Sequence, residues 1–256
     1  MSYDPVQRHH AVEKLVTHSG PEGQKKKYYR FRPAKWYGGI VTADCAGCGL
    51  LCRFCWVRDE IMLHPDRIGR FCASAEVADW LVKLARRYGL SQLRISGGES
   101  TIGKIHLLEV LNLLQGKGFS FILETNGIPI ACDQSYAKDF SKYRFVHARV
   151  SLKGCNDKEF ALLTGAKPEG FTLQLKSLQN LVEAGVSCHA SVMVSFSPKK
   201  SLQALIQRLR EISPKLAEEL EIEELILYPH VVDRIQRCGL KYGAGYEPSK
   251  VPKEQI

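Results

Sequence analysis

Residues 38–60 read GGIVTADCAGCGLLCRFCWVRDE, in which a β-rich run ends at Asp44 and leads into four of the chain's nine cysteines. Their spacing is Cys45-x2-Cys48-x3-Cys52-x2-Cys55. Structural zinc sites separate two CxxC pairs by about a dozen residues or more, and a thioredoxin-type site needs only one pair. Closely spaced thiolates on one loop instead suit a cuboidal iron–sulfur cluster. If only the last three cysteines are ligands, one iron stays open for a ligand that is not protein.

Strand-like and helix-like segments alternate from this stretch towards the C-terminus. β-rich runs predict strands at 38–44, 93–96, 119–125, 144–152, 186–194 and 223–229. Helical spacing of apolar residues predicts helices at 75–89, 105–118, 171–185 and 201–212. Such alternation with short connections predicts an α/β fold with a mainly parallel sheet, either curved towards a barrel or open and doubly wound.

Polar loops follow the first four predicted strands. They are the cysteine loop, GGES at 97–100, TNG at 125–127 and SLKG at 151–154. Ligands of parallel sheets bind where strands end, at the carboxyl edge. We therefore expect the four loops to form one site.

The length of 256 residues fits one large domain or two small ones, and no run of 18 apolar residues predicts a membrane span. The first residues, MSYDPVQRHHAVEKL, lack the apolar segment of a signal peptide, so we expect a cytoplasmic protein with no membrane partner. In that compartment close cysteines more often bind metal or react than form disulfides. We expect a loosely attached basic extension at 1–36, the main domain at 37–230 and a tail at 231–256.

The formal net charge is +9, and cations alternate with aromatic residues in KKKYYRFRPAKW, residues 25–36. Two interpretations are open. The segment binds RNA or DNA, with bases stacked on Tyr28, Tyr29 or Phe31, or it is a basic strand that keeps the protein in solution.

The segment CGLLCRFC, residues 48–55, resembles the CxxxCx(aromatic)C signature of the radical S-adenosylmethionine superfamily, and SGGES resembles its Gly-Gly-Glu motif. The resemblance spans about 37–229 and implies a partial (β/α)6 TIM-type barrel with mainly parallel strands. It implies that a [4Fe–4S] cluster is bound by Cys48, Cys52 and Cys55, and that a reductant such as flavodoxin or ferredoxin supplies electrons. It also implies that S-adenosylmethionine contacts the aromatic and Gly-Gly-Glu positions, Phe54, Gly97, Gly98 and Glu99.

Cys45 departs from the signature. It is an alternative ligand, a redox accessory or a small apolar residue beside the cluster. We expect the last, because a fourth thiolate would close the open iron.

Within the superfamily, ETNG (124–127) and VSLKGCNDKEFALLTG (150–165) resemble segments of the activases of glycyl radical enzymes. That resemblance implies a protein substrate, and cofactor contacts from Thr125, Asn126, Ser151 and Lys153. Trp56 and Val57 depart from the polar pair usual in activases. The sequence identifies no residue that acts on the substrate, although His189 and His230, at the ends of predicted strands, are candidates to reach it.

Two other functions are open as alternatives. The CxFCW segment also resembles the cluster loop of a radical enzyme that builds tricyclic bases in tRNA, which implies an RNA substrate. A non-enzymatic electron carrier fits less well, because it would use four cysteine ligands and has no need of a Gly-Gly-Glu loop.

Overall fold

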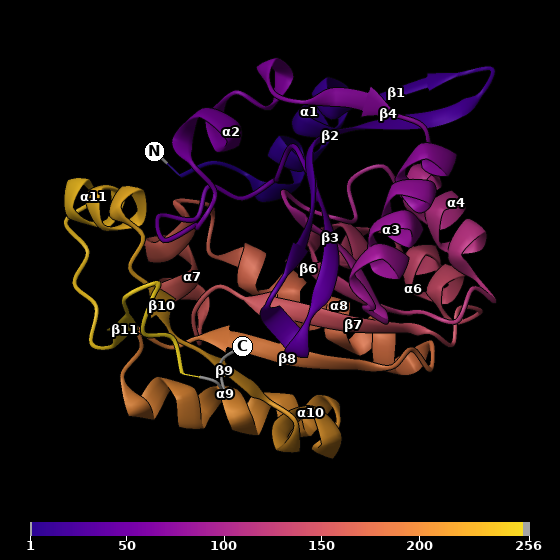
Figure 1. Cartoon of the computed structure of the whole chain (residues 1–256). Coiled ribbons are helices and arrows are strands. Elements are labelled where there is room, and N and C mark those ends of the chain that lie inside the picture. The colour runs from indigo at the N-terminus through magenta and orange to yellow at the C-terminus, as the bar shows by residue number, and fades with distance from the viewer. Residues whose placement is uncertain (1, 253–256) are drawn as a thin grey trace.

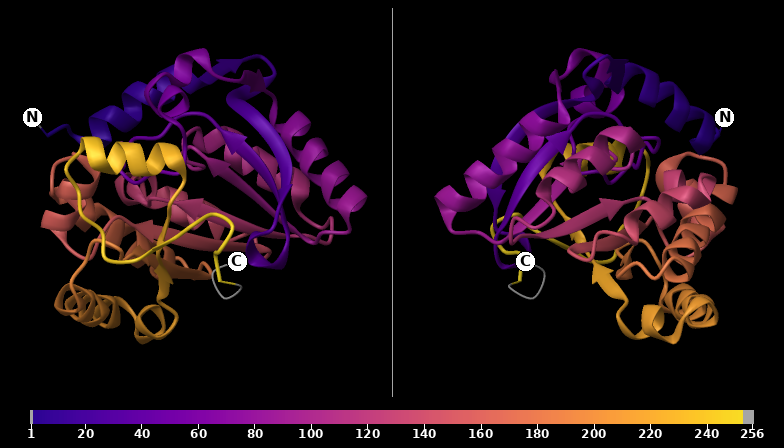
Figure 2. Two further views of the ribbon diagram at one scale, coloured as in Figure 1. Left: turned by 60° about the vertical axis from the view of Figure 1, so that its left-hand side comes forward. Right: turned by 90° about the vertical axis from the view of Figure 1, so that its right-hand side faces the viewer.

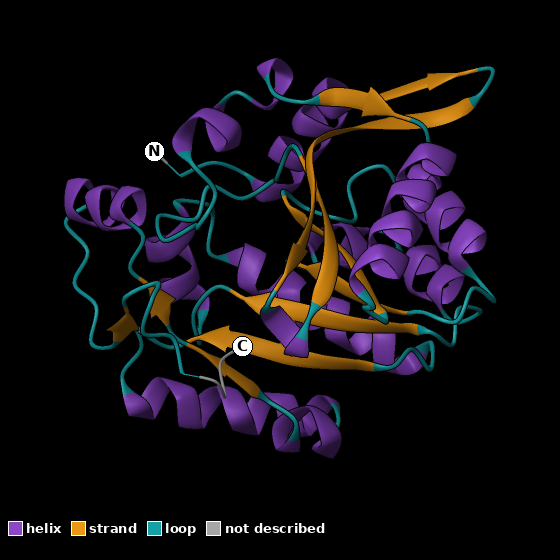
Figure 3. Cartoon of the chain, in the orientation of Figure 1, coloured by secondary structure: helices purple, strands orange, loops and turns teal. Residues whose placement is uncertain are grey.

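The computed structural model describes residues 2–252. Its centre is a curved sheet of six adjacent parallel strands, as the sequence predicts (Figures 1 and 3). In sheet order these are β3 (Ile40–Cys45), β5 (Gln92–Gly97), β6 (Ser120–Thr125), β7 (Val146–Leu152), β8 (Cys188–Met193) and β9 (Glu221–Glu223). Within residues 2–252 no pairing joins β9 back to the first strands, so the barrel is partial and open on one side.

Helices cover the outer face of the sheet (Figure 1). The four predicted ones are α3 (Ser74–Tyr88), α4 (Lys104–Leu114), α8 (Glu169–Glu183) and α9 (Lys199–Ile212). The helix α4 ends four residues before its predicted end at 118, because Gln115 is extended (ψ 132°) and Gly116 has a φ of +76°. Shorter helices without a clear sequence pattern complete the connections: α2 (Asp59–Leu63), α5 (Ile128–Cys132), α6 (Gln134–Phe140), α7 (Asp157–Thr164) and α10 (Pro214–Glu218).

The N-terminal segment is part of the fold. It forms α1 (Pro5–Val16), β1 (Thr17–Gly20) and β2 (Gly23–Ala34), and β2 pairs antiparallel with β3 and with β4 (Arg70–Cys72). The expectation of a loosely attached extension is therefore wrong for residues 5–34. Their lysines suggest a surface segment, but backbone pairing and buried contacts bind β2 to the barrel.

The C-terminal segment also differs from the expectation. The predicted strand at 223–229 is replaced by the end of β9 and by β10 (Leu225–Ile226), which pairs with β11 (Gly245–Tyr246). Pro229 begins α11 (Pro229–Arg237), because proline suits the first position of a helix and cannot continue a strand ladder. Helix α11 lies beside the loop that follows β3 (Figures 1 and 2).

Alternation along the strands separates an apolar layer from a polar one. Leu93, Ile95, Leu123 and Val150 are fully buried in the main hydrophobic core. The neighbouring residues of each strand face the inside of the partial barrel, which we call the lumen, and they are largely charged. They are Asp44, Arg94, Glu124, Arg149, Glu221 and Glu223. No helix within residues 2–252 is both long and apolar enough to cross a membrane.

Candidate functional site

The loop after β3 carries the three signature cysteines. Cys52 is buried, while Cys48 and Cys55 are half-buried. Burial raises the pKa of the Cys52 thiol to about 12 and also raises the pKa values of Cys48 and Cys55. Without a metal these thiols are neutral at pH 7, so binding iron releases protons.

The arrangement of these thiols does not suit a single metal ion. Among residues 2–252 only His9, His10 and Glu13 form a group whose ligand atoms all lie within 4.8 Å of one another. The loop cysteines are spread more widely, as a cluster with several irons requires. The fourth cysteine, Cys45, is fully buried on β3, with its Sγ 3.7 Å from the backbone oxygen of Glu99.

The Gly-Gly-Glu loop is packed directly on the cysteine loop. The backbone N–H of Gly98 donates to the Cys45 oxygen at 2.8 Å, and that of Glu99 donates to the Gly47 oxygen at 2.7 Å. A Cβ atom on Gly98 would lie 2.2 Å from the Gly47 oxygen. The glycine is thus required by the contact between two loops.

The buried Glu99 carboxylate joins this loop to the TNG loop. One oxygen accepts from the hydroxyls of Thr101 and Thr125, each at 2.6 Å, and the other accepts from the backbone N–H of Asn126 at 2.8 Å. Behind the loop, the buried Lys26 ammonium donates to the backbone oxygens of Glu99 and Ser100 at 2.9 Å. Glu99 therefore holds the Gly-Gly-Glu loop and the TNG loop together.

Asn126 extends the site to the cysteines. Its Oδ1 accepts from the backbone N–H of Ile128 at 3.0 Å, which fixes the side chain, and its Nδ2 donates to the Cys48 sulfur at 3.6 Å. Phe54 is buried under the loop, 5.7 Å from the ring of Phe196. Phe54 belongs to the hydrophobic core against which Cys48 and Cys55 pack.

The SLKG loop supplies a cation. Lys153 donates to the Ser151 hydroxyl at 2.6 Å, and Ser151 donates to Glu223 at 3.1 Å. The fully buried Gln174 amide donates to the backbone oxygens of Asn126 at 2.8 Å and Ser151 at 2.9 Å, and so fixes the two loops together. Gln174 was not predicted from the sequence, although a glutamine on the apolar side of FTLQLKSLQNL was the signal that could have found it.

Helix α11 holds the cysteine loop from the C-terminal side. The buried Arg234 guanidinium donates to the backbone oxygens of Cys55 and Val57 at 2.6 and 2.7 Å and to Asp59 at 2.6 Å. Burial alone would raise the pKa of Asp59, but hydrogen bonds from Arg237 and Arg234 lower it below its usual value. Of the two histidine candidates, His230 bonds to the backbone oxygen of Trp56 at 2.7 Å in the same loop.

The other candidate, His189, lies in the lumen, 2.9 Å from Glu221 and 2.6 Å from His147. Burial alone would raise the pKa of Glu221, but hydrogen bonds from Arg149 and His189 lower it to about 2. Nearer the β3 edge of the sheet, Arg94 on β5 donates to Glu124 on β6 at 2.5 Å. The lumen is therefore a polar chamber in which most charges are paired.

The basic segment is only partly exposed, because Tyr28 is buried while Tyr29 and Phe31 are half-buried. Tyr28 is buried and its hydroxyl contacts His106, while Phe31 stacks on Trp80 with ring centres 5.9 Å apart. The buried Lys27 ammonium donates to the backbone oxygen of Asp66. Tyr28, Lys26 and Lys27 therefore make contacts within the fold.

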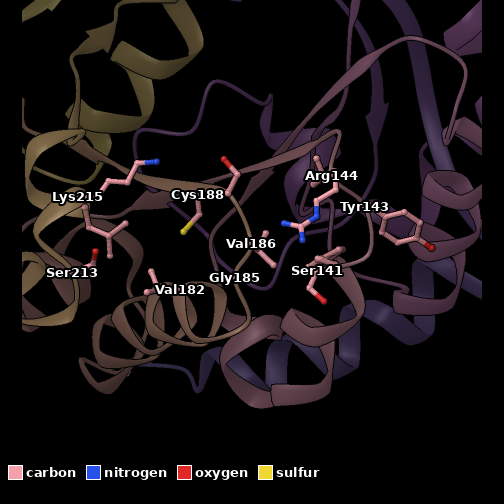
Figure 4. A pocket seen from close by; sticks show the side chains of 13 residues that line it. Ser141, Tyr143, Arg144, Val182, Gly185, Val186, Cys188, Ser213 and Lys215 are labelled. Atoms are coloured by element: carbon pink, nitrogen blue, oxygen red, sulfur yellow. The ribbon is translucent and has the colours of Figure 1, made fainter.

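A separate pocket of about 370 Å³ lies at the other end of the strands. It is lined by residues at the starts of β7 and β8, with Arg144, Cys188 and Lys215 on its walls (Figure 4). Since the cysteine loop follows the carboxyl end of β3, this pocket is not part of the site.

Comparison with known proteins decides the family. A model of the radical SAM superfamily matches residues 44–209. The chain belongs to this superfamily. Its cofactors are therefore a [4Fe–4S] cluster and S-adenosylmethionine, and the radical SAM fold accounts for the partial barrel. No curated protein matches the chain.

Solved structures with a similar fold include proteins with bound S-adenosylmethionine or a bound peptide. Streptococcus suis SuiB bound to its precursor peptide SuiA has a TM-score of 0.60 at 17% identity, over 81% of this chain and 48% of that one. Native anSMEcpe with bound AdoMet and the Cp18Cys peptide has a TM-score of 0.55 at 17% identity, over 74% and 51%. TYW1 with a lysine–pyruvate adduct has a TM-score of 0.51 at 16% identity, over 77% and 71%. The chain spans about half the length of the first two.

The site of this radical SAM protein fits both cofactors. Three buried or half-buried thiols share one loop, and the Lys153 ammonium beside them has no carboxylate within 4 Å among residues 2–252. The Tyr29 hydroxyl is buried without a hydrogen-bond partner in the described part of the chain, and a Cβ atom on Gly97 would lie 2.7 Å from it. A ligand with oxygen and nitrogen groups would complete these contacts.

Proposed function

We propose that this radical SAM enzyme removes a hydrogen atom from a peptide segment of a partner protein, as an activase-like enzyme. Cys48, Cys52 and Cys55 would hold the cluster. When reduced by a donor such as flavodoxin or ferredoxin, the bound cluster and S-adenosylmethionine supply a 5′-deoxyadenosyl radical. The chain's task is then to position groups and to exclude water.

The arrangement of the loops supports this role for the site. The amide of Asn126 donates to the Cys48 sulfur, and Lys153 presents a cation suited to a carboxylate of the cofactor. Phe54 and the buried core around it shield the cysteines from water. The Tyr29 hydroxyl and the Gly97 backbone border the same space, where the amino acid part of the cofactor would lie.

The open side of the barrel is the observation that carries the proposal for a polypeptide substrate. Strands β2 and β9 bound a polar lumen and are not joined to each other within residues 2–252. A chain can therefore enter from the side without being threaded through a closed ring. SuiB and anSMEcpe, whose folds are similar, have each been solved with a peptide bound.

An RNA substrate is the alternative, and the structure weakens its main support. Lys26 and Lys27 are bonded to backbone oxygens, and Lys25 pairs with Glu22 at 2.8 Å. The three lysines at the start of this segment therefore offer few free cations for a phosphate chain.

Transfer of deuterium identifies the class of substrate. Proteins and RNA would be purified separately from cells grown in deuterated medium and incubated anaerobically with unlabelled enzyme, S-adenosylmethionine and dithionite. We expect 5′-deoxyadenosine one mass unit heavier with the protein pool and unlabelled product with the RNA pool. The Cys52→Ala variant is the control for transfer without a cluster. Label arising only from RNA would replace the proposal with the RNA alternative.

A further inference from the structure

Two lumenal arginines on β2 share a single carboxylate. Arg30 and Arg32 donate to the same oxygen of Asp44, at 2.6 and 2.9 Å. The Asp44 side chain is fully buried, whereas the side chains of Arg30 and Arg32 are 46% and 24% exposed. This edge of the lumen therefore has one positive charge in excess, and both guanidinium side chains remain partly exposed.

The other lumenal arginines have no such excess. Arg94 is paired with Glu124, and Arg149 is shared between Glu221 and Glu223. Among the lumenal arginines, the surplus positive charge is therefore confined to Arg30 and Arg32 on β2. This strand lies on the open side of the barrel.

An exposed aromatic ring adjoins Arg32. Trp56 directly follows the third signature cysteine, and its side chain is among the exposed large apolar groups, at 39%. The Arg32 guanidinium lies over its ring, 6.0 Å from the centre. The contact orients the guanidinium and places the surplus charge beside the loop where the radical is formed.

From these contacts, and resting on the proposed function, we infer that the substrate segment carries a carboxylate that docks on Arg30 and Arg32 beside Trp56. An arginine pair presents parallel N–H donors to a carboxylate, and the surplus of one charge matches a monoanion. A phosphate monoester carries about −1.5 to −2 and would be only partly neutralised. The acidic group is an aspartate or glutamate side chain, or the carboxyl end of a peptide.

Binding of short peptides tests this without any turnover. The probes are capped tripeptides, Ac-Gly-Asp-Gly-amide and its asparagine and phosphoserine counterparts. Their dissociation constants would be measured by NMR on cluster-loaded enzyme with S-adenosylmethionine and an oxidised cluster. We expect the aspartate peptide to bind about tenfold more tightly than the asparagine peptide. Arg30→Gln and Arg32→Gln should each abolish the preference, and Arg30→Lys should keep it.

Two controls separate this inference from its alternatives. The exposed Arg67 serves as a matched site, and Arg67→Gln should leave the preference unchanged. The effect of S-adenosylmethionine on the electron paramagnetic resonance spectrum of the reduced cluster should persist in Arg30→Gln and Arg32→Gln. Its loss would overturn the inference by making these arginines part of the cofactor site.

Two further outcomes of the binding experiment would overturn the inference. Tightest binding of the phosphoserine peptide, lost in Arg30→Gln, would overturn the carboxylate assignment in favour of a phosphate. Equal binding of all three peptides would overturn the docking site itself. Either result leaves the deuterium transfer experiment unaffected, so the proposed function stands or falls separately.

Discussion

The Arg234 guanidinium donates to the backbone oxygen of Cys55 over 2.6 Å, although the two residues are 179 positions apart in the chain. Together with its bonds to Val57 and Asp59, this contact makes α11 a clamp on the cysteine loop. Removing a buried cation from its partners leaves their acceptors unpaired, which costs more than the contact itself contributes.

Arg234→Met should therefore destabilise the protein by about 1–3 kcal/mol, the cost of leaving buried polar partners unpaired. It should also lower the iron bound after reconstitution. Denaturant unfolding and iron content per chain measure both effects. The matched control is Arg237→Gln, because Arg237 contacts the same Asp59 from an exposed position and should change stability by at most about 1 kcal/mol. Equal behaviour of the two variants would show that α11 is not a clamp.

Gly98→Ala should separate the Gly-Gly-Glu loop from the cysteine loop, because the added Cβ atom would lie 2.2 Å from the Gly47 oxygen. We expect a loss of the change that S-adenosylmethionine causes in the electron paramagnetic resonance spectrum. Gly20→Ala is the control, since a Cβ atom there has nothing closer than 3.9 Å. A normal spectral change in Gly98→Ala would mean that the loop contact is not needed to bind the cofactor.

Cys45→Ala should keep the cluster, whereas Cys48→Ala, Cys52→Ala and Cys55→Ala should each lose it. The reason is that the Cys45 sulfur is buried against the Glu99 backbone oxygen. Iron content and the visible absorption of the reconstituted variants measure this. A cluster lost from Cys45→Ala would make Cys45 a ligand and close the open iron.

The parallel core was predictable from the sequence, because short buried strands such as 93–96 differ clearly from amphipathic helices such as 75–89. The gathering of the four loops at one edge was predictable for the same reason. Three sets of contacts confirm it: Gly98 with Cys45, Asn126 with Cys48, and Gln174 with both Asn126 and Ser151. Whether each residue binds a cofactor as expected stays a prediction.

The rest depended on contacts between distant segments. The lysines of β2 suggest a solvent-exposed segment, yet Lys26 is buried because backbone oxygens of the Gly-Gly-Glu loop accept from it. The sequence of α11 carries a helical pattern, but nothing in it says that Arg234 meets the cysteine loop. A polar side chain that satisfies a remote backbone has no local signature.

Stability should fall in mild acid because of His106. Burial lowers the pKa of its imidazole to about 4, against about 6.5 in the unfolded chain. Between these values the unfolded state binds the proton and the folded state does not, so stability falls as the pH is lowered from about 6.5 to 4. The loss should reach about 3 kcal/mol.

The free energies of unfolding of His106→Gln and of the unchanged protein, each measured at pH 7 and pH 4.5, give this contribution. The variant is less stable at pH 7, because Tyr28 and Ser74 lose a partner, but its stability should depend less on pH. His64→Gln, at an exposed position, should keep the full acid dependence. An unchanged pH dependence in His106→Gln would place the acid sensitivity elsewhere.

Tyr29→Phe should separate binding from stability. The Tyr29 hydroxyl is buried without a partner in the described residues, so its removal should leave the free energy of unfolding of the cofactor-free protein unchanged or slightly higher. If the hydroxyl bonds to S-adenosylmethionine beside Gly97, the same change should weaken cofactor binding up to about tenfold, the equivalent of one hydrogen bond. Titration of the cluster-loaded protein with S-adenosylmethionine measures the affinity. Lower stability with unchanged affinity would show that Tyr29 serves the fold and not the ligand.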